Sequence, residues 1–141
     1  MTQIDLSNKN ILITGASNGI GKAIAEYLIQ MRAKVAIHYH SNYDNAKELE
    51  SLCSNGSKAF QANLSNESDV YDLFKNVISD FKRLDAIVLN AGVFLEHSTD
   101  LNTDHWMAIW KKTLDINLNS VGLLTKLGID HYKEMNAGRF V

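Results

Sequence analysis

The sequence predicts a doubly wound α/β fold, in which a parallel sheet carries helices on both faces. Short apolar segments alternate with segments of helical periodicity along almost the whole chain of 141 residues. The segment 85–90 (DAIVLN) is apolar at consecutive positions, as expected when both faces of a strand are covered. A glycine-containing turn at 15–21 joins the first apolar segment to the first helical one. This alternation favours parallel strands joined by right-handed crossovers, and we expect one domain over residues 1–141.

Five segments are predicted to be strands. The first, NILIT, is rich in isoleucine and too short for a helix. The third is weaker than the others, and the fifth, GRFV, contains only the opening of a strand. The predicted strands cover residues 10–14, 34–39, 58–62, 85–90 and 138–141. We therefore expect the sheet to be incomplete at its fifth strand.

Four segments are predicted to be helical because apolar residues recur in them every three or four positions. They cover residues 20–32, 43–54, 65–81 and 103–135, the last in two pieces. Ser65 or Asn66 is expected to cap the third helix, and Gly56 to close the second. The third helix is predicted to bury Val70, Leu73, Phe74, Val77, Ile78 and Phe81. One side of the last helical segment carries Leu114, Leu118, Val121, Leu124 and Gly128.

Composition and charge exclude several classes of protein. The 14 Lys and Arg side chains nearly balance the 16 Asp and Glu side chains, so no basic surface favours nucleic acid. No apolar run approaches the roughly 18 residues needed to cross a membrane, and the N-terminus lacks the pattern of a secretory signal. Cys53 is the single cysteine, which excludes an internal disulfide and fits a reducing cytoplasm. The five histidines have no metal-ligand spacing, so we expect no metal site.

Gly15, Gly19 and Gly21 lie where the first predicted strand ends and the first helix begins. Glycine permits a tight turn there and lets a diphosphate approach the bare backbone. The unpaired N–H groups at the helix N-terminus then face the phosphates. The alternative interpretation is a glycine-rich turn without a ligand. The order TGASNGIG lacks the G-x-x-x-x-G-K-[ST] pattern, which excludes a P-loop ATPase.

Three motifs occur in order, each at a matching element. TGASNGIG (14–21) has the spacing T-G-x-x-x-G-x-G, LNAG (89–92) ends the fourth predicted strand, and DINLNSVG (115–122) lies in the last helical segment. Together they resemble the glycine motif, the N-N-A-G motif and the active-site asparagine segment of the short-chain dehydrogenase/reductase family. The resemblance covers essentially the whole chain. It implies a Rossmann fold that binds NAD or NADP and transfers hydride between the nicotinamide and a carbonyl compound or secondary alcohol.

The resemblance also implies a set of cofactor-binding residues at the strand ends. They are Gly15, Ser17, Asn18, Gly19, Ile20, Gly21, Tyr39, His40, Ser41, Asn63, Leu64, Asn90, Ala91 and Gly92. Asn63 stands where the family usually has an acidic residue that touches adenine, and a simple loop role is the alternative for it. Asn90, Ala91 and Gly92 would close the nicotinamide side and brace the central strand, or merely form a turn. His38 is expected to be a strand histidine rather than a ligand.

The end of the second predicted strand bears on the choice between NAD and NADP. An Asp or Glu there typically holds the ribose 2′-hydroxyl of NAD, whereas it repels the 2′-phosphate of NADP. Tyr39 stands where NAD-preferring relatives tend to have Asp, and His40 where NADP-preferring relatives often have Arg. No acid occurs before Asp44, although Asn18 is not the basic residue of many NADP-dependent relatives. We expect NADP rather than NAD, and the missing acid also argues against a methyltransferase.

The catalytic set of the family is matched only in part. The resemblance implies a Ser that holds the substrate oxygen and, in Y-x-x-x-K, a Tyr whose pKa a Lys lowers, all placed after the fifth strand. Of this set only Asn117 is matched; the resemblance implies that it interrupts a long helix and anchors a water, and the alternative is a polar residue that kinks the helix. YDNAK (43–47) and YDLFK (71–75) also fit Y-x-x-x-K. They fall on helices away from the nicotinamide, so we expect no catalysis from them.

Two interpretations of function follow. In the first, which we favour, the 141 residues belong to a longer cytoplasmic enzyme that forms a homo-oligomer, a dimer or tetramer, and acts on a small carbonyl compound or alcohol. In the second, the product ends at Val141 and is a non-catalytic dinucleotide-binding fragment or interaction module. The leucine-rich side of residues 103–135 fits either a helix–helix dimer interface or a stripe that faces the core.

Overall fold

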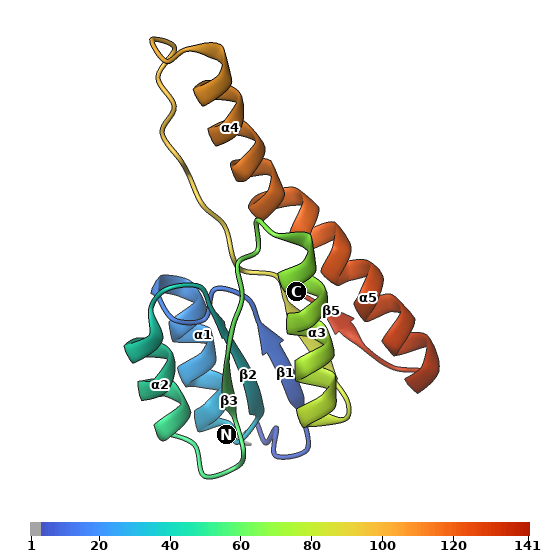
Figure 1. Cartoon of the computed structure of the whole chain (residues 1–141). Coiled ribbons are helices and arrows are strands. Elements are labelled where there is room, and N and C mark those ends of the chain that lie inside the picture. The colour runs from blue at the N-terminus through green and yellow to red at the C-terminus, as the bar shows by residue number, and fades with distance from the viewer. Residues whose placement is uncertain (1–3) are drawn as a thin grey trace.

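Within residues 4–141, which a computed structural model describes, five parallel strands form one sheet (Figure 1). The strands are β1 (Asn10–Ile13), β2 (Lys34–Tyr39), β3 (Lys58–Gln61), β4 (Ala86–Val88) and β5 (Arg139–Phe140). Their spatial order is β3-β2-β1-β4-β5, so β1 lies at the centre and the chain crosses from β3 to the far side of β1 to form β4. The doubly wound α/β class predicted from the sequence is confirmed.

Helices cover both faces of this sheet. They are α1 (Gly19–Gln30), α2 (Tyr43–Ser51), α3 (Glu67–Phe81), α4 (Thr103–Leu114) and α5 (Ser120–Met135), with a π-helical turn, η1 (Asp115–Asn119), between the last two. α1 and α2 pack on one face, and α3 and α5 pack on the other (Figure 1). None of the helices described in residues 4–141 has the length and apolar character needed to cross a membrane.

The strands divide their side chains between two apolar layers. Leu12 and Ile87 face α3 and α5, whereas Ile13 and Val35 face α1 and α2, and all four side chains are fully buried. Because successive strand residues point to opposite faces, each neighbour meets a different layer of helices. This arrangement explains why β4 is apolar at consecutive positions.

Several elements end earlier than their apolar patterns predict. α1 ends at Gln30 rather than near Arg32, because Arg32 has a φ of 68°, which an α-helix cannot continue through. α2 ends at Ser51 rather than at residue 54. β4 covers Ala86–Val88 of the predicted 85–90.

The leucine-rich side predicted for residues 103–135 does not form one continuous face. Leu124 is buried in the core, whereas Leu118 is 61% exposed. The π-helical turn lies between α4 and α5, and it changes the rotation per residue, so the α-helical periodicity cannot be continued across it. The buried stripe of α5 instead comprises Ser120, Leu124, Gly128 and Tyr132.

α4 extends away from the sheet and has no buried residue (Figure 1). Trp106 and Trp110 stack on its surface with ring centroids 5.3 Å apart. The His97 ring lies edge-on to both, at 4.9 Å and 6.0 Å between centroids. These contacts hold the extended segment that precedes α4 alongside the helix.

Candidate functional site

A cavity of about 440 Å³ opens where the carboxyl ends of β1, β2 and β4 meet, and we call it the strand-end cavity. β1 pairs with β2 on one side and with β4 on the other, so this is the point where the sheet reverses its strand order. Ligands of doubly wound sheets bind at such a point. The lining residues are Gly15, Ser17, Asn18, Gly19, Ile20, Gly21, His38, His40, Ser41, Asn42, Asn63, Leu64, Asn90, Ala91, Gly92, Val93 and Ile116. The set contains every cofactor-binding residue predicted from the sequence except Tyr39.

The glycine loop lies close to its neighbours at two of its three glycines. Gly15 has a φ of 65°, in the left-handed region that favours glycine. A Cβ added to Gly21 would lie 2.2 Å from the Gly15 carbonyl oxygen and 2.4 Å from Asn90 Nδ2. Gly19 also has a positive φ, 52°, but a Cβ there would meet nothing within 4 Å. Gly21 is therefore the glycine that lets α1 begin against the loop.

Asn90 braces the central strand from the end of β4. Its side-chain Nδ2 donates hydrogen bonds to the backbone oxygens of Thr14 and Gly15, at 3.0 Å and 3.2 Å. The Ala91 N–H donates to the Thr14 hydroxyl oxygen at 3.0 Å. The ends of β1 and β4 are thus fixed to each other at the floor of the strand-end cavity.

His38 links three segments around the strand-end cavity. Its Nδ1 accepts a hydrogen bond from the Gly15 N–H at 2.9 Å, and its Nε2 lies 3.1 Å from the Ala62 carbonyl oxygen. Burial lowers the pKa of His38 to about 4, against the opposing effect of the hydrogen bond to Ala62. The ring is therefore neutral near pH 7, with the proton on Nε2 so that it donates to Ala62.

The end of β2 presents alternate residues to the strand-end cavity. His40 and Ser41 line it, whereas Tyr39 does not. Because side chains alternate along a strand, Tyr39 points to the opposite face from His38 and His40. There it packs edge-on against Tyr43 of α2, with 6.1 Å between ring centroids. The geometry places Tyr39 beneath α2 rather than at the cavity predicted for it.

Asn63 both lines the strand-end cavity and forms the turn into α3. Its Oδ1 accepts hydrogen bonds from the Ser65 N–H at 3.1 Å and the Ser65 hydroxyl at 2.8 Å. Its backbone N–H donates to Asp69 Oδ2 at 3.0 Å. The loop role and the cavity position, which the sequence left as alternatives, are thus compatible in this residue.

Asn117 lies in the π-helical turn, where the long helical segment is interrupted as the resemblance implies. Its Oδ1 accepts a hydrogen bond from the Val93 N–H at 2.8 Å, and its Nδ2 donates to the Val93 carbonyl at 2.7 Å. The side-chain amide is therefore committed to the segment that follows β4. Its neighbour Ile116, rather than Asn117 itself, lines the strand-end cavity.

The two Y-x-x-x-K sequences lie on helices outside the strand-end cavity. Tyr43 and Lys47 are on α2, where Lys47 pairs with Glu50 at 2.8 Å and lies 5.8 Å from the centre of the Tyr43 ring. Tyr71 and Lys75 are on α3. None of these four residues lines the strand-end cavity.

Four residues line the strand-end cavity without having been predicted from the sequence: His38, Asn42, Val93 and Ile116. Alternation in β2 could have found His38, because His40 on the same face was already a candidate. Val93 directly follows the LNAG motif, and Ile116 lies within DINLNSVG, next to Asn117. Their lining positions depend on the contact between the segment after β4 and the π-helical turn, which no local pattern predicts.

The strand-end cavity carries no carboxylate, Lys or Arg among its lining residues, and its titratable side chains are histidines. Backbone N–H groups, side-chain amides and two serine hydroxyls give it mostly uncharged hydrogen-bonding groups. Among residues 4–141, no cluster of three His, Cys, Asp or Glu side chains could hold a metal ion. The N–H, amide and hydroxyl donors of the lining suit a polar anionic ligand.

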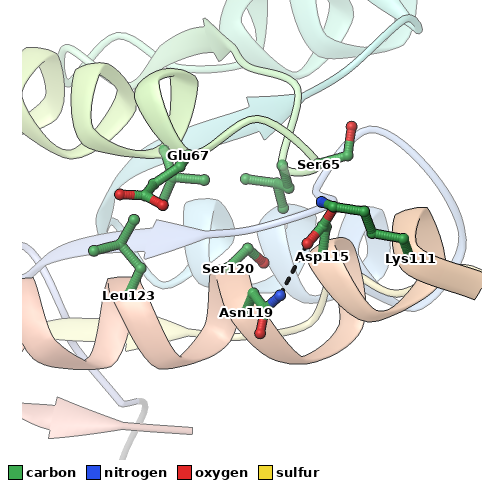
Figure 2. A pocket seen from close by; sticks show the side chains of 9 residues that line it. Ser65, Glu67, Lys111, Asp115, Asn119, Ser120 and Leu123 are labelled. Carbon is green, nitrogen blue, oxygen red and sulfur yellow. Dashed lines mark hydrogen bonds and ion pairs between the residues drawn. The ribbon is translucent and has the colours of Figure 1, made fainter. Parts of the chain in front are cut away.

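A second cavity, of about 370 Å³, lies between the start of α3 and the α4–α5 segment. Figure 2 shows Lys111 and Asn119 beside Asp115. Asn119 Nδ2 donates a hydrogen bond to the Asp115 carboxylate, with a donor–acceptor distance of 2.9 Å. The hydrogen bonds from Lys111 and Asn119 hold the pKa of Asp115 below its usual value. The Lys111 charge is thus paired within the wall, and the Glu67 carboxylate in the same wall would repel a phosphate. The strand-end cavity is therefore the better candidate for an anionic ligand.

Comparison with known proteins gives consistent matches over nearly all of the chain. A family model described as short chain dehydrogenase matches residues 9–141. Glucose 1-dehydrogenase 2 of Bacillus subtilis (strain 168) is 32% identical over 139 residues, covering 94% of this chain and 52% of that protein. The 15-hydroxyprostaglandin dehydrogenase [NAD(+)] of Homo sapiens is 34% identical, covering 94% of this chain and 47% of that protein. The chain thus spans about half the length of the curated relatives it matches.

Comparison with solved structures also gives matches over nearly all of the chain. The NADPH-dependent 3-quinuclidinone reductase from Rhodotorula rubra superposes with a TM-score of 0.84 at 28% identity, covering 98% of this chain and 52% of that one. A short chain dehydrogenase from Burkholderia cenocepacia J2315 in complex with NADP gives a TM-score of 0.78 at 30% identity, covering 92% of this chain and 52% of that one.

Proposed function

The chain belongs to the short-chain dehydrogenase family, and we propose that it forms the dinucleotide-binding domain of an oxidoreductase. In this proposal, hydride passes between NADP or NAD and a small carbonyl compound or secondary alcohol. The observation that carries it is the strand-end cavity, where the glycine loop and the N-terminus of α1 border a space without carboxylates. The dehydrogenase and reductase names of the relatives support the same class of reaction.

The residues of the strand-end cavity fit a dinucleotide diphosphate. The N–H groups of Gly19, Ile20 and Gly21 have no hydrogen-bond partner within residues 4–141. Such groups at a helix N-terminus bind anions, because the N–H dipoles point toward them. A side chain at Gly21 would collide with the Gly15 carbonyl. Only glycine at this position therefore lets α1 begin close enough to the loop for both to contact one phosphate.

Each part of the lining has a proposed role toward the dinucleotide. We place the diphosphate against residues 15–21, the adenine beside Asn63 and Leu64, and the nicotinamide half beside Asn90, Ala91 and Gly92. When bound, the nicotinamide supplies the hydride chemistry. The chain's own residues bind and orient the dinucleotide, and Asn90 keeps the cavity floor fixed through Thr14 and Gly15.

We propose NADP as the preferred dinucleotide. His40, Ser41 and Asn42 line the cavity at the end of β2, and none of them carries a negative charge that would repel a 2′-phosphate. The Burkholderia cenocepacia structure was solved with NADP, and the Rhodotorula rubra reductase is NADPH-dependent, which supports the assignment. The human relative, in contrast, is named for NAD(+).

Asn117 is proposed as part of the active site through its position next to the nicotinamide side. Its side-chain amide orders Val93, and Val93 and Ile116 both line the strand-end cavity. Asn117 thus acts on the cavity by fixing the backbone that forms its wall. We therefore treat it as a positioning residue.

We also propose that the protein forms a homo-oligomer through the α4–α5 region. α4 buries none of its residues within residues 4–141. Met107, Trp110 and Leu118 are exposed there. Light scattering of the purified protein tests this assignment, and a strictly monomeric mass at all concentrations would overturn it.

The proposed function is tested by titrating the purified protein with NADPH and with NADH in a calorimeter. We expect NADPH to bind at least about tenfold more tightly than NADH. Equal affinities would overturn the NADP assignment, and no binding of either would overturn the dinucleotide site. Oxidation of NADPH with a panel of ketones and aldehydes then tests the reaction, and binding without turnover would favour a non-catalytic binding module.

A further inference from the structure

Asn18 stands at the N-cap of α1 but does not cap the helix. Its backbone has the extended conformation of a cap residue, with φ −144° and ψ 161°, yet its side chain makes no hydrogen bond to the first turn. An Asn at this position ordinarily accepts a hydrogen bond from the N–H two or three residues further on, here that of Ile20 or Gly21.

Two other asparagines of this chain do cap their helices. Asn66 accepts a hydrogen bond from the Ser68 N–H at 3.0 Å at the start of α3. Asn102 accepts one from the His105 N–H at 2.9 Å at the start of α4. Asn42 and Asn119, at the starts of α2 and α5, make no such hydrogen bond, so asparagine caps some helices of this protein and leaves others, α1 among them, uncapped.

The oxygen of Asn18 is engaged by a residue of a different helix. Asn45, in the first turn of α2, donates from Nδ2 to Asn18 Oδ1 at 2.9 Å. The same Nδ2 donates to the Ser17 carbonyl oxygen at 3.1 Å. The amide of Asn45 thus holds the Asn18 oxygen toward α2 and away from the N-terminus of α1.

We propose that Asn45 is a positioning residue for the dinucleotide diphosphate. By holding Asn18 Oδ1, it keeps this oxygen from capping Ile20 and Gly21, and their N–H groups remain available to a phosphate. Without Asn45, the Asn18 side chain would compete with the ligand for the same donors. The inference rests on the proposed dinucleotide site, to which it adds a residue outside the cavity lining.

The test compares Asn45→Ala, Asn18→Ala and the double variant with the unaltered protein, using NADPH as the probe in calorimetric titrations. We expect N45A to bind NADPH about fivefold more weakly, the effect of one competing helix cap. Removing the Asn18 oxygen as well should reverse this loss, so the double variant should bind more tightly than N45A and as well as N18A. A merely structural role of Asn45 in holding α2 would not be rescued in this way.

Amide hydrogen exchange of the ligand-free protein gives an independent readout. In N45A, the N–H groups of Ile20 and Gly21 should exchange more slowly, because Asn18 now caps them, and this protection should vanish in the double variant. A double variant no tighter than N45A, or unchanged exchange at both amides in N45A, would overturn the proposal. Absence of NADPH binding by the unaltered protein would instead count against the proposed function, and the exchange measurement would still decide whether Asn45 withholds the cap.

Discussion

Asn117 holds the backbone of Val93 with both ends of its side-chain amide, at 2.8 Å from Oδ1 to the Val93 nitrogen and 2.7 Å from Nδ2 to its carbonyl oxygen. The pairing joins the π-helical turn to the segment that follows β4, 24 residues earlier in the chain. An amide is the natural side chain for this contact, because it carries a donor and an acceptor side by side.

Asn117→Asp should loosen this segment. The carboxylate keeps an acceptor for the Val93 N–H but places negative charge against the Val93 carbonyl, so we expect a loss of about 1 kcal/mol in the free energy of unfolding. Urea unfolding and hydrogen exchange of the Val93 amide measure the effect. Asn119→Ser, in the same turn, is the control, and unchanged protection of the Val93 amide in N117D would contradict the interpretation.

The glycine loop offers a matched pair of variants, Gly21→Ala and Gly19→Ala. A Cβ at Gly21 meets backbone 2.2 Å away, whereas a Cβ at Gly19 meets nothing within 4 Å and adds only the strain of a positive φ. We expect G21A to destabilise the protein by about 3 kcal/mol and G19A by about 1 kcal/mol. Chemical denaturation ranks the stabilities of the two variants. A G19A variant less stable than G21A would show that the close contact at Gly21 does not determine the loss of stability.

Two glycines of α5 should respond in opposite directions to alanine. At Gly128, a Cβ would lie 2.7 Å from the Phe140 ring and 2.8 Å from Ile87, so G128A should destabilise the packing of α5 on the sheet by about 1–3 kcal/mol. At Gly122 nothing lies within 4 Å, so G122A should stabilise the helix by up to about 1 kcal/mol. Thermal unfolding of both variants measures whether each substitution raises or lowers the stability of the protein. Equal effects would mean that burial of Gly128 does not matter.

His38 should make stability depend on pH in the mildly acidic range. Its pKa is about 4 in the folded protein and 6.5 without burial, so between these values the unfolded state binds the proton more readily. The free energy of unfolding should therefore fall by about 3 kcal/mol as the pH decreases from about 6.5 to about 4, and this contribution is fully present above pH 6.5. Urea unfolding at several pH values measures the slope.

His38→Asn should flatten this slope, because the amide does not titrate. His105→Gln, at an exposed position on α4, serves as the control for the replacement of a histidine. If H38N retained the full dependence on pH, other groups would be responsible for it.

Much of the fold could be predicted from the sequence because the apolar patterns are strong. The alternating segments located all five strands, and the period-3.6 stripe of α3 matched the residues buried there, such as Val70 and Leu73. Boundaries were less predictable, because they depend on single backbone conformations such as the left-handed Arg32. The prediction of one leucine-rich side over residues 103–135 was wrong for a related reason, because a π-helical turn cannot be recognised from an α-helical periodicity.

The candidate site could be predicted where a sequence motif is typical of one backbone geometry. The glycine loop and the segment Asn90 to Gly92 were identified in this way, and both line the strand-end cavity. The partners of individual side chains were not predictable. The contacts of His38 with Gly15 and of Asn117 with Val93 join residues far apart in sequence, so only the folded topology determines them. Tyr39 lies away from the strand-end cavity because side chains alternate along β2, and the family position alone does not show this.

The crossing from β3 to the far side of β1 also sets an order of events during protein synthesis. The chain as far as β3 contains the complete glycine loop, but β1 then has a partner only on its β2 side. Thr14 and Gly15 acquire their contacts to Asn90 across 76 and 75 residues of chain. A nascent chain on the ribosome therefore exposes an open strand edge and an unbraced loop until Asn90 has emerged. The strand-end cavity is assembled after translation of the fourth strand, and until then the free edge of β1 is open to a chaperone that binds strand edges.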